Sequence, residues 1–167
     1  MNEKWRYEDF QMREIGRVIR NFSWLENTIK EGLCRYLKLG VLDCFTLTAH
    51  LGFRQTLDLL ESFYKTDRKL RQRKGVVLGR LLRKAEVAEG GRNEIVHSLW
   101  LPERFKKNDI KLSQVRVTSR RGLDINTVHG RTLAQVETIR EIADGFYRLN
   151  KQLRKALHLR LDDIVEF

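Results

Sequence analysis

The chain has 167 residues and carries 33 Lys and Arg against 22 Asp and Glu, a formal net charge of +11 at neutral pH. This length supports one domain with a real core, and 41% hydrophobic residues with a single proline exclude a disordered chain. No run approaches the roughly 20 apolar residues that span a bilayer, and no secretory signal opens the chain. We therefore expect a cytoplasmic protein, not a membrane protein, and nucleic acid is the leading partner class for so basic a chain. A basic surface that only maintains solubility is the alternative.

The first half of the chain predicts a helical hairpin. Apolar residues at alternating steps of three and four predict one helix over about 8–38 and a second over about 42–64. Gly40 suits a left-handed cap between them, and a connection this short predicts antiparallel packing. Cys34 and Cys44 lie on apolar stretches without metal-ligand or disulfide-framework spacing, so we predict two reduced core residues.

A third helix is predicted over about 67–89, and it carries the strongest cluster of positive charge in the chain. Its apolar residues recur at helical spacing, so the helix can bury one face while it displays its cations. Phosphate binding is the functional interpretation of this cluster, and a solvated face is the alternative. The predicted nucleic-acid-binding residues are Arg68, Lys69, Arg71, Arg73, Lys74, Arg80, Arg83 and Lys84.

The candidate active site follows directly, at residues 92–97. Gly90-Gly91 is expected to break the helix, so that a short new helix begins near Arg92 and offers unpaired backbone N–H groups to a phosphate. Asn93 and His97 are four residues apart and share a helical face, which the long Arg92 side chain can reach. A guanidinium can pair with a phosphate, while histidine exchanges protons near neutral pH.

The remaining elements complete a predicted bundle. Leu99, Trp100 and Leu101 are expected to anchor the new helix in the core, and Pro102 to end it. Residues 111–128 alternate apolar with polar around a glycine-containing turn, which predicts a small β-hairpin. A last helix over about 132–159 closes the fold. We thus predict an all-α fold, an antiparallel bundle of four to five helices with a β-hairpin insertion, as a single domain over residues 1–167.

Arg92, Asn93 and His97 resemble the R-N-x-x-x-H signature of HEPN domains (higher eukaryotes and prokaryotes nucleotide-binding), a family of helical domains. The resemblance extends to the helical hairpin, the basic third helix and the closing helix, while the β-hairpin departs from it. It implies a metal-independent endoribonuclease in which the 2′-hydroxyl of RNA attacks the phosphate. His97 would be the general acid/base, Arg92 the phosphate ligand and Asn93 the orienting residue. The resemblance also implies a homodimer with both motifs in one cleft and an antitoxin or regulatory partner. It further implies a role in toxicity, phage defence or RNA processing, which the sequence does not separate.

Two other function classes stay open at this stage. The same residues could form a non-catalytic module that binds nucleic acid or nucleotide as a dimer, or a structural partner protein. No metal site or cofactor is predicted. Glu26, Glu89 and Glu94 are all plausible neighbours of the site, and the sequence does not rank them.

Overall fold

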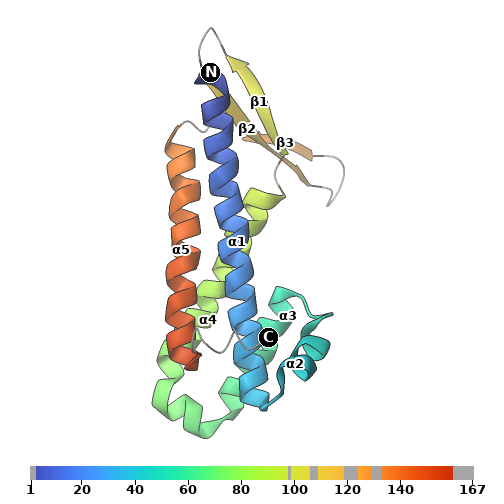
Figure 1. Ribbon diagram of the computed structural model, residues 1–167, viewed down its shortest axis with the longest axis vertical. Helices are drawn as coiled ribbons and strands as arrows, with labels where there is room; N and C mark the ends of the chain where they lie inside the picture. The colour runs from blue at the N-terminus through green and yellow to red at the C-terminus, as the bar shows by residue number, and fades with distance from the viewer. Residues whose placement is uncertain (1–2, 98, 106–108, 119–123, 129–132, 160–167) are drawn as a thin grey trace. The chain divides into compact units, whose positions relative to one another are not determined.

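The computed structural model describes residues 3–97, 99–105, 109–118, 124–128 and 133–159 (Figure 1). These residues form five helices and three strands, and the predicted helical bundle is confirmed. The helices are α1 (Glu3–Leu37), α2 (Val41–Thr48), α3 (Phe53–Thr66), α4 (Arg68–Val96) and α5 (Leu133–Leu157). The strands are β1 (Leu99–Phe105), β2 (Asp109–Thr118) and β3 (Asp124–Val128). In the described part of the chain, no helix is both long enough and apolar enough to cross a membrane.

The chain divides into two compact units, and α1, α4 and α5 each contribute to both. The first unit comprises residues 1–20 and 90–144, and it contains the candidate active site and the strands. The second unit comprises residues 21–89 and 145–167.

The second unit has an apolar core formed by four helices. Phe22 of α1 lies between two other aromatic rings, with its centroid 4.8 Å from that of Phe53 in α3 and 5.6 Å from that of Phe146 in α5. Such tilted and edge-on pairs add to the stabilisation that comes from burial alone. The predicted apolar stripes supply the rest of this core, through Leu25, Ile29 and Leu33 of α1, Leu57 and Leu60 of α3, Leu81 and Leu82 of α4, and Leu153 of α5.

Polar contacts fix the direction of α5 against α1 in the second unit. The Thr28 hydroxyl donates to Asn150 Oδ1 over 2.6 Å, and the Arg154 guanidinium donates to Glu31 over 2.9 Å. The later residue of α1 contacts the later residue of α5, so the two helices run parallel (Figure 1). In an antiparallel bundle of five helices the first and the fifth have the same direction, so this pair is not at odds with the predicted arrangement.

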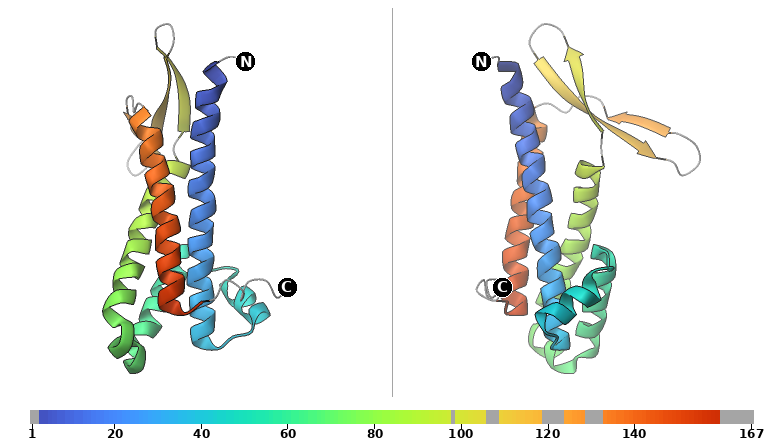
Figure 2. Two further views of the ribbon diagram at one scale, coloured as in Figure 1. Left: turned by 60° about the vertical axis from the view of Figure 1, so that its left-hand side comes forward. Right: turned by 45° about the vertical axis from the view of Figure 1, so that its right-hand side comes forward.

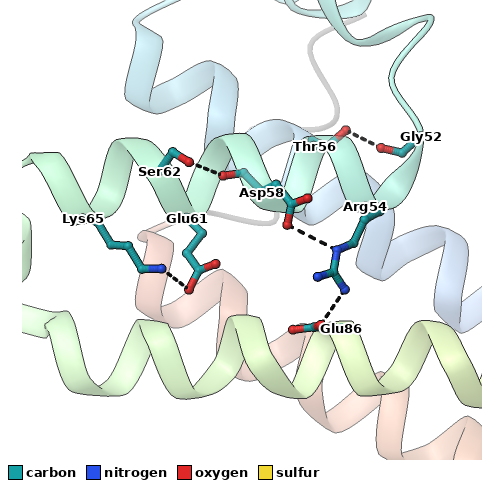
Figure 3. Close-up of polar contacts among 8 residues, drawn as sticks. All are labelled: Gly52, Arg54, Thr56, Asp58, Glu61, Ser62, Lys65 and Glu86. Carbon is teal, nitrogen blue, oxygen red and sulfur yellow. Dashed lines mark hydrogen bonds and ion pairs between the residues drawn. The ribbon is translucent and has the colours of Figure 1, made fainter.

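The predicted second helix over 42–64 is two helices, α2 and α3, and this prediction is also wrong. Residues 49–52 separate them, and Gly52 takes an extended conformation as the N-cap of α3. The Gly52 N–H donates to Gln55 Oε1 over 2.9 Å. The Gly52 carbonyl accepts from the Thr56 hydroxyl over 3.0 Å (Figure 3). The bond to Gln55 satisfies a backbone N–H at the start of the helix, so it favours a new start over continuation.

Cys34 and Cys44 form a disulfide across the turn between α1 and α2, and their Cα atoms are 5.4 Å apart. The prediction of two reduced residues is therefore wrong. Lys38, with φ 56°, takes the left-handed conformation that we expected at Gly40, which is extended. This turn directs the chain back, so that Cys44 on α2 meets Cys34 on α1 ten residues earlier in the sequence. Neither residue's local sequence contains that information.

In the first unit, α4 is followed by a three-stranded antiparallel sheet in the order β1-β2-β3 (Figure 2). Leu99 pairs with Val115 across the first pair of strands, which corrects the expectation that residues 99–101 continue a helix. Pro102 lies within β1. It is tolerated because β1 is an edge strand, where a missing N–H can face away from the ladder. Strands β2 and β3 occupy the range of the predicted hairpin, whose tip at 119–123 lies outside the described residues.

Candidate functional site

The motif lies on the last turn of α4, which is one continuous helix from Arg68 to Val96. The predicted break at Gly90-Gly91, with a new helix near Arg92, is wrong. A glycine costs only about 1 kcal/mol relative to alanine inside a helix, which is too little to interrupt one that is anchored on both sides. Ile95, 5% exposed, provides that anchor within the motif. The His97 N–H closes the last turn by donating to the Asn93 carbonyl over 3.0 Å.

The Arg92 side chain contacts both other motif side chains. Arg92 Nη1 donates to Asn93 Oδ1 over 2.8 Å and lies 3.3 Å from His97 Nε2. The structure therefore brings together the three residues that the sequence singled out. His97 is exposed, while Arg92 and Asn93 are half-buried.

The contact between Arg92 and His97 is a hydrogen bond only in one tautomer of the imidazole. A guanidinium has only hydrogen-bond donors, so in the contact with Arg92 the Nε2 atom of His97 must be the acceptor. A general base uses this same lone pair of Nε2, so His97 can act as one only after its contact with Arg92 is released.

The helix dipole acts on this site in the opposite direction from our prediction. Arg92 was expected at a helix N-terminus, where free N–H groups attract anions, but it lies at the C-terminal end of α4. That end carries partial negative charge and favours cations. A phosphate at this site is therefore attracted by the Arg92 guanidinium and not by the backbone.

The predicted nucleic-acid-binding residues all lie on α4, in the part that belongs to the second unit. The side chains of Arg68, Lys69, Arg71, Arg73 and Lys74 lie outside the described part of the structure. Arg80, Arg83 and Lys84 are exposed on one face, opposite the buried Leu78, Leu81, Leu82 and Ala85. These three cations thus form a solvent-facing basic strip.

The three candidate acidic neighbours are now distinguished. Glu26 forms an ion pair with Lys30 over 3.0 Å in the second unit, and Glu89 also belongs to that unit. Glu94 lies inside the motif and is exposed. Of the three, only Glu94 belongs to the unit that holds Arg92 and His97.

An ion-pair network in the first unit escaped the sequence analysis. Arg17 donates to Glu14 over 2.7 Å and to Asp144 over 2.5 Å, and Glu14 is almost fully buried, with 2% exposure. Burial acts to lower the pKa of Arg17, but hydrogen bonds and charge from both carboxylates outweigh it, so the pKa is raised. Arg140 approaches Glu14 at 3.7 Å and stacks 4.9 Å from the centre of the Phe10 ring. The available signal was a carboxylate on the apolar stripe of α1, one turn before Val18.

No family model matches this sequence, and no curated protein or solved structure is detectably similar to it. The function of this chain is therefore inferred from its residues and from the motif resemblance.

Proposed function

We propose that this protein is a metal-independent endoribonuclease of the HEPN type, which cleaves RNA through attack by the 2′-hydroxyl. The observation that supports this most directly is the contact of Arg92 with both Asn93 Oδ1 and His97 Nε2. It combines a phosphate ligand, an orienting amide and a proton acceptor within one helical turn. RNA is the proposed substrate, and the basic strip of Arg80, Arg83 and Lys84 is a proposed contact for its phosphates.

The proposed chemistry is transphosphorylation with a balanced proton. As Arg92 turns to the phosphate, His97 Nε2 leaves the guanidinium and accepts the proton of the 2′-hydroxyl, and the resulting oxygen attacks the adjacent phosphorus. Arg92 pairs with the non-bridging oxygens as negative charge accumulates on them. The bond from phosphorus to the 5′ oxygen breaks, and the imidazolium returns the proton to that leaving oxygen. The products are a 2′,3′-cyclic phosphate and a 5′-hydroxyl.

Asn93 is proposed to hold Arg92 ready for this step. Its Oδ1 atom accepts from Nη1, the same guanidinium nitrogen that faces His97. A fixed guanidinium loses less conformational freedom when it pairs with the transition state. The cytoplasm is the proposed location, as expected from the sequence. By the resemblance, the protein acts as a homodimer with its two motifs facing a shared cleft, in toxicity, phage defence or RNA processing, with an antitoxin or regulatory protein as further partner.

RNA cleavage in EDTA by the purified protein tests this proposal. His97→Ala and Arg92→Ala should each lower the rate by at least about 100-fold, the usual contribution of a positioned general base or charge stabiliser. His50→Ala and Arg148→Ala remove one histidine and one arginine side chain from exposed positions in the second unit. These two control variants should cleave like wild type. Equal rates for all four variants would contradict the proposal.

A non-catalytic binding module is the second candidate. The observation that favours it is that Arg92 already bonds within its own motif, so the same contacts could serve only to secure the end of α4. In that case both motif variants would melt well below wild type, and wild type would bind RNA without cutting it. Salt-sensitive binding with intact RNA after long incubation would establish this function.

A further inference from the structure

The outer face of α1 carries a shallow hollow of about 330 Å³, lined by Arg13, Gly16, Arg17 and Arg20. These residues are three or four apart, so they lie on neighbouring turns of one helical face. Gly16 is exposed, and no heavy atom lies within 4 Å of the position that a Cβ would occupy. Packing therefore does not require a glycine at position 16, although a glycine inside a helix costs about 1 kcal/mol relative to alanine.

The Arg17 guanidinium is held in place by two carboxylates. Arg17 donates through Nη1 to Glu14 over 2.7 Å and through Nη2 to Asp144 over 2.5 Å. Glu14 is buried and also attracts Arg140, so its charge is shared between two cations. Arg13 and Arg20 are exposed on either side of Gly16. The hollow thus has a fixed guanidinium along one edge and two solvent-facing ones at its ends.

The chemistry of the lining indicates an anionic ligand with several separate charges. Guanidinium groups bind phosphate oxygens through paired, planar donors. Arg13 and Arg20 are seven residues apart, which is roughly 10 Å along the helix axis, more than one phosphate spans. A glycine between them allows a ligand chain to approach the helix backbone closely.

We propose that this hollow binds the phosphodiester backbone of RNA at nucleotides away from the scissile bond. Naming RNA as the ligand rests on the proposed function, while the anion site rests on the arginines alone. The hollow and the Arg92 motif belong to the same compact unit. Arg13 and Arg20 contact phosphates, and Arg17 forms the edge of the hollow against which the RNA lies.

Binding of a fluorescent 12-nucleotide 2′-O-methyl RNA, followed by anisotropy over a range of salt concentrations, tests the proposal. The methyl group blocks attack by the 2′ oxygen, so affinity is measured without cleavage. Arg13→Gln/Arg20→Gln should weaken binding at least tenfold and should lower the slope of log affinity against log salt by about 1.4, or 0.7 for each lost contact. Arg148→Gln/Lys155→Gln removes two exposed charges from α5 and should change the affinity less than threefold.

Gly16→Leu fills the hollow without changing the charge. Because open space surrounds the added Cβ, the variant should fold with a melting temperature at least equal to that of wild type, yet bind RNA at least fivefold more weakly. Equal weakening by the two charge-removing pairs would overturn the proposal, as would wild-type affinity in Gly16→Leu. Competition by hexaglutamate as effective as that by RNA would also overturn it, because the hollow would then accept an acidic peptide.

The outcome is separable from that of the proposed cleavage. Cleavage of a dinucleotide, which is too short to reach a second contact, should be unchanged in Arg13→Gln/Arg20→Gln. Hollow-dependent binding without any cleavage would leave the RNA site in place and refute the nuclease. Cleavage together with RNA affinity that is unchanged in the hollow variants would support the nuclease and refute the RNA site in the hollow. Absence of RNA binding by wild type would overturn both.

Discussion

Replacing Gly90 and Gly91 by alanine tests whether α4 is continuous up to the candidate site. Both glycines lie inside the helix, and nothing would meet an added Cβ at either position within 4 Å. A Gly→Ala change at a helical position of this kind stabilises by roughly 0.4 to 1 kcal/mol, partly by restricting the unfolded chain. The double variant should thus gain about 1 to 2 kcal/mol. For a chain of this size, this corresponds to a rise of roughly 2 to 8 °C in melting temperature.

Thermal and urea unfolding followed by circular dichroism at 222 nm measure this gain. Gly32→Ala in α1 is the matched control, because its Cβ would lie 2.7 Å from Leu157 Cδ1 and would displace that side chain. It should therefore stabilise less than either single change in α4. A double variant that melts below wild type would refute the reasoning and would mean that the helix breaks at these glycines. If the break is also functional, cleavage would fall with it.

Three further predictions concern the second unit. Thr28→Val removes the hydroxyl that donates to Asn150 and should cost about 1 to 3 kcal/mol in urea unfolding, because a buried acceptor is left unpaired. Reducing the disulfide between Cys34 and Cys44, which closes a loop of ten residues, should cost about 3 kcal/mol in the chain-entropy model. Burial, aided by a neighbouring carboxylate, raises the pKa of Tyr36 above 10, so the folded state keeps its proton longer than the unfolded state. Stability from this source is complete below pH 10 and is lost as the pH rises through the folded pKa, and Tyr36→Phe should not show this loss.

The following results would contradict these predictions. Thr28→Val/Asn150→Leu should recover part of the loss, since both polar partners are then gone, and a purely additive cycle would deny the hydrogen bond. Two free thiols in the unreduced, denatured protein would deny the disulfide. Parallel decline of wild type and Tyr36→Phe above pH 10 would show that the raised pKa does not contribute to stability.

The local periodicity of the sequence predicted most of the helices, because the apolar stripes are also the buried faces. Leu25, Ile29 and Leu33 recur at the expected spacing on α1, and all three are fully buried. Ile19 fits the same pattern yet is 43% exposed, because a stripe does not specify how far a partner helix extends over it.

The boundaries between elements were harder to predict, because weak local preferences compete there with tertiary contacts. The glycine pair before Arg92 favours a break by only about 1 kcal/mol per residue, and α4 continues through it. Conversely, the helix predicted over 42–64 ends early, where the Gln55 side chain caps the Gly52 N–H. A proline such as Pro102 excludes a central strand but permits an edge strand, and strand order is not written in the local sequence.

The candidate site was predictable in part for a physical reason. Arg92, Asn93 and His97 are close in sequence, so any helix through them brings their side chains within reach of one another. Whether they lie at the start or at the end of a helix determines the sign of the local dipole. The sequence did not predict this, because it depends on where α4 begins and ends. The network of Glu14, Arg17 and Asp144 joins distant segments and follows only from the packing of α1 with α5 in the first unit.

The central claim, that the 2′-hydroxyl of RNA is the nucleophile at the Arg92 and His97 site, is tested most directly by a single-atom change in the substrate. An RNA cut by the protein in EDTA would be remade with one 2′-deoxynucleotide on the 5′ side of the cleaved bond. We predict that the unmodified RNA yields a 2′,3′-cyclic phosphate and a 5′-hydroxyl, and that the deoxy-substituted RNA is not cut at that bond. Cleavage of the substituted RNA at the same bond, or products with a 3′-hydroxyl, would contradict the account.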